Sequence, residues 1–516
     1  MQQPSASAAL DDVGRSVRQP QDGLCPPAVF AVIVNACMGM GFLALPYTSM
    51  RLGPWLAAVV TLALGALATL TALWTVTALS LTAALVRGGG DPEMSSQARL
   101  MDGKAEPPAE QGGVFCLDGS GVHSFVAMVG LLYGDWSQRA ATSALTLSLV
   151  VTLWSYAALV ASSLSAMVPL PLPGSACDVY TEWSEAGCAT RYYTWLGGFA
   201  LVAVACSMLR LKEQKVFQLA MTGARFLLVT IILADCVRML VLGEEPPRPG
   251  RDGSLHLGLA QVHGGALHRG LAHGPPAPGL GEVDLRRLPR HIAVATVALA
   301  ANMVLPEAVQ DLADKPRTLL PTVGSALACC AGAYCLVGTL VALAFGDLTR
   351  PVCTLNWANY TAGEAKAGSL ALAVRALVLL VPIVDITAAY PIMALGLTSS
   401  IHSSLAGREG AEAEEWPPWY LSLLCSFLPI VGAAFIFDIA ETLGWAGVFF
   451  LPFVFLLPQM LMLRAEELCV ARFGAERVHG SLYWRWHCHR RVLLASLLAG
   501  GAFSAVACLV TLGDAL

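Results

Sequence analysis

The sequence predicts an all-α, polytopic membrane protein, and three observations support this fold class. Of its 516 residues, 56% are hydrophobic and only 13% are charged, whereas a soluble protein carries roughly a quarter charged residues. The polar residues gather between long charge-poor runs, and about 20 apolar residues are enough to cross a bilayer as a helix. The net charge of −5 is small and no basic run is present, so nothing indicates a nucleic-acid partner.

The charge-poor runs predict the transmembrane helices in order, because each is bounded by charged residues or by Pro- and Gly-rich stretches. The second and third runs exceed one bilayer thickness, so these helices are expected to tilt or to project into water. The eleven predicted spans are residues 28–48, 54–86, 140–169, 193–209, 216–242, 291–313, 319–345, 370–397, 418–437, 442–463 and 492–513.

The spans predict a membrane domain over residues 28–513, preceded by a polar tail at 1–27. A long Gly-, Pro-, His- and Arg-rich loop at 244–290 divides the domain into a first half, 28–243, and a second half, 291–463. The eleventh span, 492–513, follows the second half.

The distribution of charge predicts that the N-terminus lies in the cytosol. In this orientation the basic stretches at 210–215 and 464–491 face the cytosol, while the short outer loops are poor in Lys and Arg. The only N-glycosylation sequon, which begins at Asn359, then falls on the outer side. Cys177 and Cys188 flank another outer loop, where an oxidising compartment permits a disulfide; the alternative is that both thiols stay free.

The first span contains a stretch, NACMGMGFLALPY at residues 35–47, that suits a helix poorly. Its two glycines and Pro46 weaken or interrupt the hydrogen bonding along a helix. In lipid, an interrupted backbone is tolerated only where its freed N–H and C=O groups line a cavity or meet a ligand. Freed carbonyls suit a cation and helix N-termini suit a carboxylate, so the break predicts a site for zwitterions.

A second break is predicted half a chain later. Asn302 lies near the middle of a short apolar run that ends at Pro306 and Glu307. Of the four asparagines in the chain, Asn35 and Asn302 thus lie one in each predicted broken helix. A single asparagine in a membrane helix often only hydrogen-bonds a neighbouring helix. Two asparagines beside paired breaks favour a binding site instead.

These stretches resemble the amino acid/auxin permease family. Residues 35–55, NACMGMGFLALPYTSMRLGPW, are similar to its first span and closest to the sodium-coupled neutral amino acid transporter branch. Residues 303–327 resemble its sixth span and the following hinge, and residues 435–464 its ninth and tenth spans. The resemblance covers most of residues 28–513. It implies a LeuT-type fold, with two inverted repeats of five helices plus an eleventh helix, and secondary active amino acid transport.

The resemblance also implies roles for residues at both breaks. Asn35 matches the family asparagine that helps to hold sodium in the sodium-coupled branch. The unwound segments are expected to bind the substrate. The substrate-binding residues expected on this basis are Met38, Gly39, Met40, Gly41, Ala300, Ala301 and Asn302.

The eighth span departs from the pattern of the sodium-coupled branch. That branch has a threonine where Leu380 stands here, and Thr387 is a substitute displaced by one or two helix turns. Asp385 is a carboxylate within the same span, which makes it a functional candidate that binds a proton or a cation. The alternative is a structural ion pair with Arg225 or Arg375. Asp385 and Thr387 join Asn35 as ion-coupling candidates, and the coupling ion is either Na⁺ or H⁺.

The predicted function is cation-coupled symport of neutral amino acids. An intramembrane enzyme is disfavoured, because the ten histidines fall in loops or at span ends, and no metal site or cofactor is expected. The alternative is a membrane sensor that binds an amino acid without net transport, since one fold serves both functions. The expected location is the plasma membrane or a vacuolar or lysosomal membrane, where the protein is a glycoprotein. Amino acid and lipid are the expected partners, and the sequence identifies no protein partner.

Overall fold

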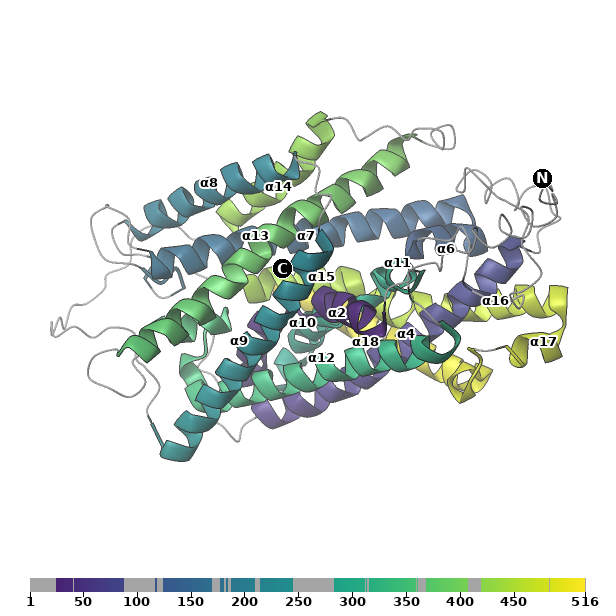
Figure 1. Ribbon diagram of the computed structural model, residues 1–516, viewed down its shortest axis with the longest axis horizontal. Helices are drawn as coiled ribbons and strands as arrows, with labels where there is room; N and C mark the ends of the chain where they lie inside the picture. Colours follow the sequence, from purple (N-terminus) through teal and green to yellow (C-terminus); the bar gives the residue numbers. More distant parts are fainter. Residues whose placement is uncertain are drawn as a thin grey trace, which may run out of the picture.

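The computed structural model is all-helical in the part of the chain that it describes, which confirms the predicted fold class (Figure 1). The described residues are 25–39, 41–87, 117, 124–168, 177–180, 182–183, 187–208, 214–244, 283–310, 312, 315–358, 360, 368–406, 419–481 and 483–515. The predictions for Met40 and Asn359 lie outside these residues.

In the described part of the chain, the first half begins with an interrupted helix and continues with four long helices and the short helix α6. The short helix α6 joins α7 at Gly134, whose φ of 85° favours glycine, and it packs against α4, α7 and α16. The helices are α2 (Pro26–Cys37), α3 (Gly41–Leu52), α4 (Pro54–Arg87), α6 (Phe125–Tyr133), α7 (Asp135–Met167), α8 (Cys188–Ser207) and α9 (Gln214–Leu242).

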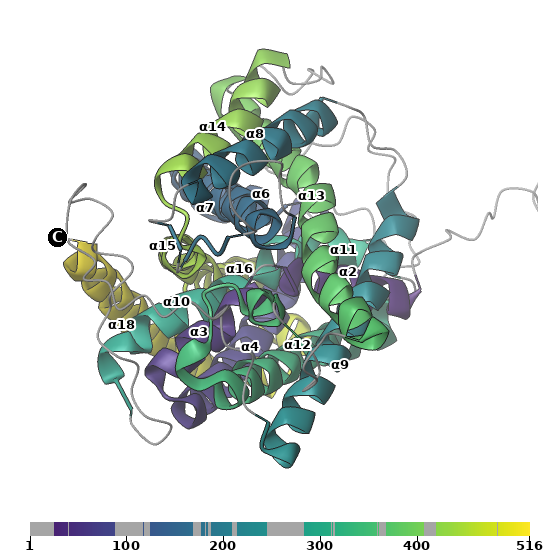
Figure 2. The ribbon, with the colours of Figure 1, turned by 90° about the vertical axis from the view of Figure 1, so that its left-hand side faces the viewer.

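The second half repeats this order. It also begins with an interrupted helix, in which the 3₁₀ turn η2 separates two α-helical pieces. The elements are α10 (Leu288–Ala298), η2 (Ala301–Met303), α11 (Leu305–Gln310), α12 (Lys315–Phe345), α13 (Ser369–Ala406), α14 (Trp419–Phe435), α15 (Ile439–Phe455) and α16 (Leu457–Phe473). The last long helix, α18 (Arg490–Ala515), packs at the edge of the molecule against α10, α15 and α16 (Figure 2).

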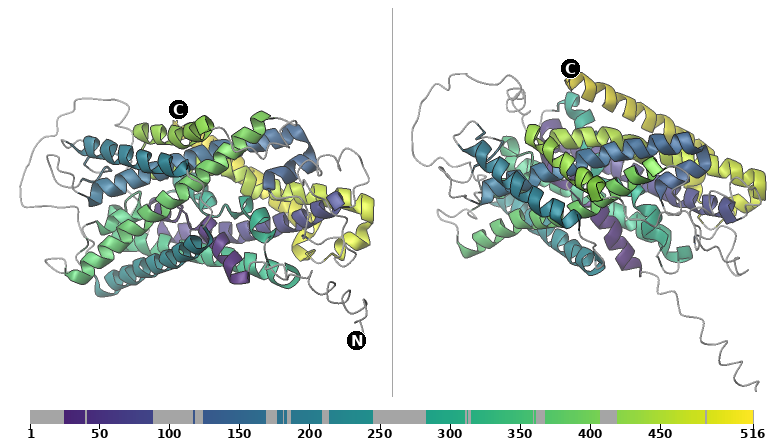
Figure 3. Two further views of the ribbon diagram at one scale, coloured as in Figure 1. Left: turned by 45° about the horizontal axis from the view of Figure 1, so that its top comes forward. Right: turned by 90° about the horizontal axis from the view of Figure 1, so that it is seen from above.

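Equivalent helices of the two halves pack against each other. The helix α3 contacts α10, α4 contacts α12, α7 contacts α13, and α8 contacts α14. Contacts between non-equivalent helices are also reciprocal, because α9 packs on α12 in the same way that α15 packs on α4. Such reciprocal packing is what two inverted repeats produce. The described helices thus form two halves that pack against each other, with α18 as an additional helix, and Figure 3 shows the long helices of both halves running side by side.

A helix or helix pair lies at each of the eleven predicted spans. By length and composition, six of the described stretches can each cross a membrane, and the bent pair α2–α3 adds a seventh. The remaining four positions are less regular: α10–α11 is interrupted, α14 has 17 residues, and α8 and α9 carry charged side chains. The number of spans and the predicted domain boundaries therefore stay predictions.

Candidate functional site

The first span is interrupted where the sequence predicts it. The helix α2 ends at Cys37 and α3 begins at Gly41, and the two axes are bent by 51°. The carbonyl of Val34 accepts from the N–H of Met38 and that of Cys37 accepts from the N–H of Gly39, both at 2.7 Å. The carbonyl of Asn35 accepts from a side chain of another helix, described below.

The second interruption lies between Ala298 and Leu305. The Tyr334 hydroxyl of α12 donates to the freed carbonyl of Ala298 at 3.1 Å. Asn302 is 2% exposed, and its amide nitrogen lies 3.2 Å from the Thr71 hydroxyl and 3.4 Å from the carbonyl of Val454. Asn302 therefore connects the second interruption to α4 and α15. This matches the alternative in which an asparagine in a membrane helix only hydrogen-bonds its neighbouring helices. Ala300 and Ala301 belong to the same turn.

The two interruptions meet at Gly41. A Cβ atom added to Gly41 would lie 2.5 Å from the Cβ and 2.7 Å from the Cα of Ala298. No real side chain tolerates such an approach, so glycine is required here for close packing of the backbones. The predicted residues Gly41 and Ala300 are thus brought into one region, although the sequence separates them by half the chain.

A buried ion pair caps the C-terminal end of α2. Arg225 of α9 and Asp385 of α13 are 5% and 8% exposed. The guanidinium donates through Nε to one Asp385 oxygen at 2.9 Å and through Nη2 to the other at 2.8 Å. Its Nη1 donates to the carbonyl of Asn35 at 2.9 Å and to its amide oxygen at 2.7 Å. Bidentate pairing of this kind is strong and geometrically specific.

Thr222 completes this cluster, since its hydroxyl donates to the Asn35 amide oxygen at 2.8 Å. The structure therefore brings Asn35 and Asp385 together, as their predicted common role requires, and selects Arg225 as the partner of Asp385. Thr387 does not join them through its hydroxyl, which donates to the carbonyl of Ile383 in its own helix. Leu380 is 42% exposed and points away from the cluster.

A small cavity adjoins the ion pair and the first break. Apart from the two charged residues and Gly39, its walls are apolar. The lining residues are Gly39, Phe42, Leu43, Arg225, Leu228, Val381, Pro382, Asp385 and Ile386. The cavity places an apolar surface, the N-terminus of α3 and the Arg225–Asp385 pair within one enclosure.

Tyr156 of α7 faces the same break and was not predicted. A Cβ on Gly39 would lie 3.3 Å from the Tyr156 hydroxyl, and the Tyr156 residue is only 7% exposed. Among the described residues, this hydroxyl has no hydrogen-bond partner. Nothing in the sequence distinguishes Tyr156 from a packing tyrosine, because its role depends on α7 crossing the break.

His291 is the first residue of the predicted span 291–313, which agrees with the expectation that histidines lie in loops or at span ends. It is fully buried near the start of α10, with Nδ1 3.0 Å from the Thr48 hydroxyl and Nε2 3.0 Å from the Thr61 hydroxyl. The Thr48 hydroxyl donates to the carbonyl of Leu45, so it accepts from the histidine ring. The ring of His291 thus joins α3, α4 and α10.

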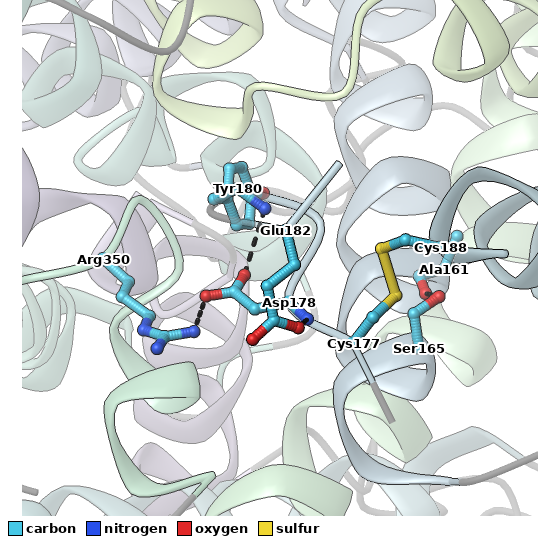
Figure 4. Close-up of a disulfide and its surroundings, with 8 residues drawn as sticks. All are labelled: Ala161, Ser165, Cys177, Asp178, Tyr180, Glu182, Cys188 and Arg350. Carbon is cyan, nitrogen blue, oxygen red and sulfur yellow. Dashed lines mark hydrogen bonds and ion pairs between the residues drawn. A yellow bond between two sulfur atoms is a disulfide. The ribbon is translucent and has the colours of Figure 1, made fainter. Parts of the chain in front are cut away.

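The predicted outer cysteines form a disulfide in the structure (Figure 4). Next to Cys177, the carboxylate of Asp178 forms an ion pair with Arg350 and accepts from the N–H of Tyr180 at 3.0 Å. Burial lowers the pKa of Arg350 to about 10, so its guanidinium stays charged at neutral pH. This pair connects the α7–α8 loop with the segment that follows α12, and so joins the two halves at one end.

Comparison with curated protein sequences found no match. Among solved structures, a similar one is Mhp1, a nucleobase-cation-symport-1 family transporter in a closed conformation with bromovinylhydantoin bound. The alignment has a TM-score of 0.44 and 11% identity, and it covers 96% of this chain and 94% of Mhp1.

The family comparison is more direct. The family model described as transmembrane amino acid transporter protein matches residues 26–475. The match begins at the first residue of α2 and extends beyond the end of α16, so it includes both interrupted helices and the Arg225–Asp385 pair. The chain therefore belongs to the transmembrane amino acid transporter family.

Proposed function

We propose that the protein is a secondary active transporter that carries neutral amino acids through its membrane by alternating access, in symport with a cation. The observation that supports this proposal is the meeting of two interrupted helices at Gly41 and Ala298 in a member of this family. The N-terminus of α3 offers free N–H groups to a carboxylate, and the carbonyls at the end of α2 attract positive charge. A zwitterion fits such a pair of opposed helix ends.

The chemistry of the residues beside the first break supports a neutral rather than a charged side chain on the substrate. The two charged residues of the lining, Arg225 and Asp385, neutralise each other at 2.8 Å. The rest of the lining is apolar, with Phe42, Leu43 and Ile386 among it. A charged substrate side chain would find no counter-charge there and would lose its hydration, which is costly in an apolar environment.

We further propose that the N-terminus is cytosolic and that the protein resides in the plasma membrane or in a vacuolar or lysosomal membrane. The charge distribution of the loops supports this orientation. The Cys177–Cys188 disulfide lies at the end of the molecule assigned to the outside, where it is chemically compatible with an oxidising compartment.

Uptake into proteoliposomes tests the proposed function. Purified protein is reconstituted, a panel of radiolabelled neutral, acidic and basic amino acids is added outside, and sodium and pH gradients are imposed separately. We expect uptake of neutral amino acids above that of empty liposomes, and its loss in Gly41→Leu, whose side chain collides with Ala298. Saturable binding without uptake in any gradient would instead establish the sensor alternative.

A further inference from the structure

Oxygen atoms of neighbouring residues surround the Arg225 guanidinium. The groups around it are the carbonyl and amide oxygens of Asn35 and both carboxylate oxygens of Asp385, and each is within 2.9 Å of a guanidinium nitrogen. The Thr222 hydroxyl lies 2.8 Å from the same amide oxygen. Carbonyl and carboxylate oxygens are the ligands that hard metal cations prefer.

The location of these oxygen atoms at the end of a helix also favours a cation. They lie at the C-terminal end of α2, where the helix dipole is negative and where the carbonyl of Asn35 accepts from Arg225. Asp385 adds a full negative charge from α13. The residues Asn35, Arg225 and Asp385 are each at most 9% exposed, so this charge has little access to water and requires a positive partner.

We propose that Arg225 is a built-in cation that permanently occupies the ion position beside Asn35, so that transport through this site does not require sodium. This inference rests on the proposed function. A sodium ion among the same oxygens would overlap with Nη1 of Arg225 and would be repelled by its charge. Because the guanidinium is attached to α9, it stays in the protein through the transport cycle, and no sodium ion moves at this position.

The proposal also gives Arg225 a mechanical role. Its guanidinium joins three helices, since it belongs to α9 and binds α2 through Asn35 and α13 through Asp385. A dissociable ion connects such elements only when it is bound. A fixed guanidinium maintains the connection at any sodium concentration.

Sodium replacement in the uptake assay is the first test. Wild-type uptake is measured in media in which sodium chloride is replaced by choline chloride at equal ionic strength, with the pH gradient held constant. We expect the rates in the two media to agree within about twofold. A wild-type rate that falls to the level of empty liposomes without sodium would overturn the proposal. Absence of uptake in both media contradicts the proposed function instead.

A binding measurement tests the site independently of transport. The unfolding temperature of detergent-purified protein is measured against sodium chloride, with choline chloride as the reference. Arg225→Ala removes the guanidinium and leaves the oxygen atoms of Asn35 and Asp385 without it. Sodium is then expected to bind these oxygens and to raise the unfolding temperature of the variant by mass action. The wild type and Arg225→Lys, which keep a positive charge, are expected to show no sodium-specific shift.

Two further variants make the outcome specific. Arg225→Ala combined with Asp385→Asn lacks the carboxylate ligand and is expected to lose the sodium response. Arg238→Ala removes the arginine of another Arg–Asp pair on α9, Arg238–Asp235, which lies away from the break. The Arg238→Ala protein is expected to show no sodium-specific shift of its unfolding temperature. An Arg225→Ala protein that sodium does not stabilise, or an equal response in Arg238→Ala, would overturn the assignment of a cation position.

Discussion

At the scale of single residues, the Tyr156 hydroxyl is a hydrogen-bonding group that faces the interruption of the first span. It is buried beside Gly39 at the interruption of the first span, and no described residue hydrogen-bonds it. A hydroxyl that faces the interruption and that no described residue uses can donate to a ligand there. We interpret Tyr156 as a donor to the substrate carboxylate.

Tyr156→Phe tests this interpretation, because the substitution removes only the hydroxyl. A hydrogen bond to a charged group contributes about 1.5–3 kcal/mol, so the KM for uptake should rise roughly tenfold or more while the unfolding temperature stays unchanged. Tyr193→Phe is the matched control, since Tyr193 is 44% exposed and its hydroxyl bonds Ala434. An unchanged KM in Tyr156→Phe would return this residue to a packing role.

Asp385 should behave as one member of an ion pair. Asp385→Asn leaves the buried Arg225 charge without its partner, which costs about 3–5 kcal/mol, so we expect a poorly folded protein by size-exclusion chromatography. Neutralising both residues, in Arg225→Met with Asp385→Leu, should restore folding without restoring transport. A well-folded Asp385→Asn protein that still concentrates substrate would contradict the ion-pair account.

The sequence predicted some of these residues and not others, for a physical reason. Asn35 and Asp385 stand out because polar groups are rare within apolar spans. The hydrogen bond from Arg225 to Asn35 joins residues that are 190 positions apart, and its existence depends on helix packing. The packing role of Asn302 depends likewise on α4 and α15. Sequence alone therefore indicated candidates but not their partners.

At the scale of secondary structure, glycine and proline predicted both interrupted helices. The end of α2 and the start of α3 coincide with the glycine-rich stretch, and the end of α10 precedes Pro306 by a few residues. The close contact of the two breaks was not predictable, since it follows from the crossing of α3 and α10. That crossing requires a residue without a side chain at Gly41.

Gly41→Ala tests the crossing. Its new Cβ would lie 2.5 Å from that of Ala298, and overpacking of this kind costs about 1–3 kcal/mol. Gly197→Ala in α8 is the matched control, because a Cβ there meets no atom within 4 Å. We expect thermal unfolding to shift downward for Gly41→Ala only. Equal unfolding temperatures for the two variants would show that the breaks lie farther apart than described.

At the scale of the whole molecule, reciprocal packing of the two halves sets the architecture. The helix order and the all-α class followed from hydropathy. In lipid, a spanning segment must satisfy its backbone N–H and C=O groups with internal hydrogen bonds, as a helix does. The pairing of α4 with α12 and of α7 with α13 came only from the structure. Hydropathy reports which segments are apolar and carries no information on which of them are neighbours.

The predicted orientation is testable at Asn359. If the N-terminus is cytosolic, this sequon faces the exterior or a lumen and should carry a glycan. Glycosidase treatment should then increase the gel mobility of the wild type and leave that of Asn359→Gln unchanged. A cytosolic reporter signal from an insertion at this position would reverse the assigned orientation or remove a span from the prediction.

Solute counterflow measures the central claim most directly, namely that an amino acid crosses the membrane through the site between the two interrupted helices. Proteoliposomes are loaded with unlabelled neutral amino acid, diluted into a trace of the labelled compound, and assayed without any ion gradient. The account predicts a transient accumulation of label inside, which Gly41→Leu abolishes. Label that binds the protein but never exceeds its external concentration inside the vesicles would contradict the account.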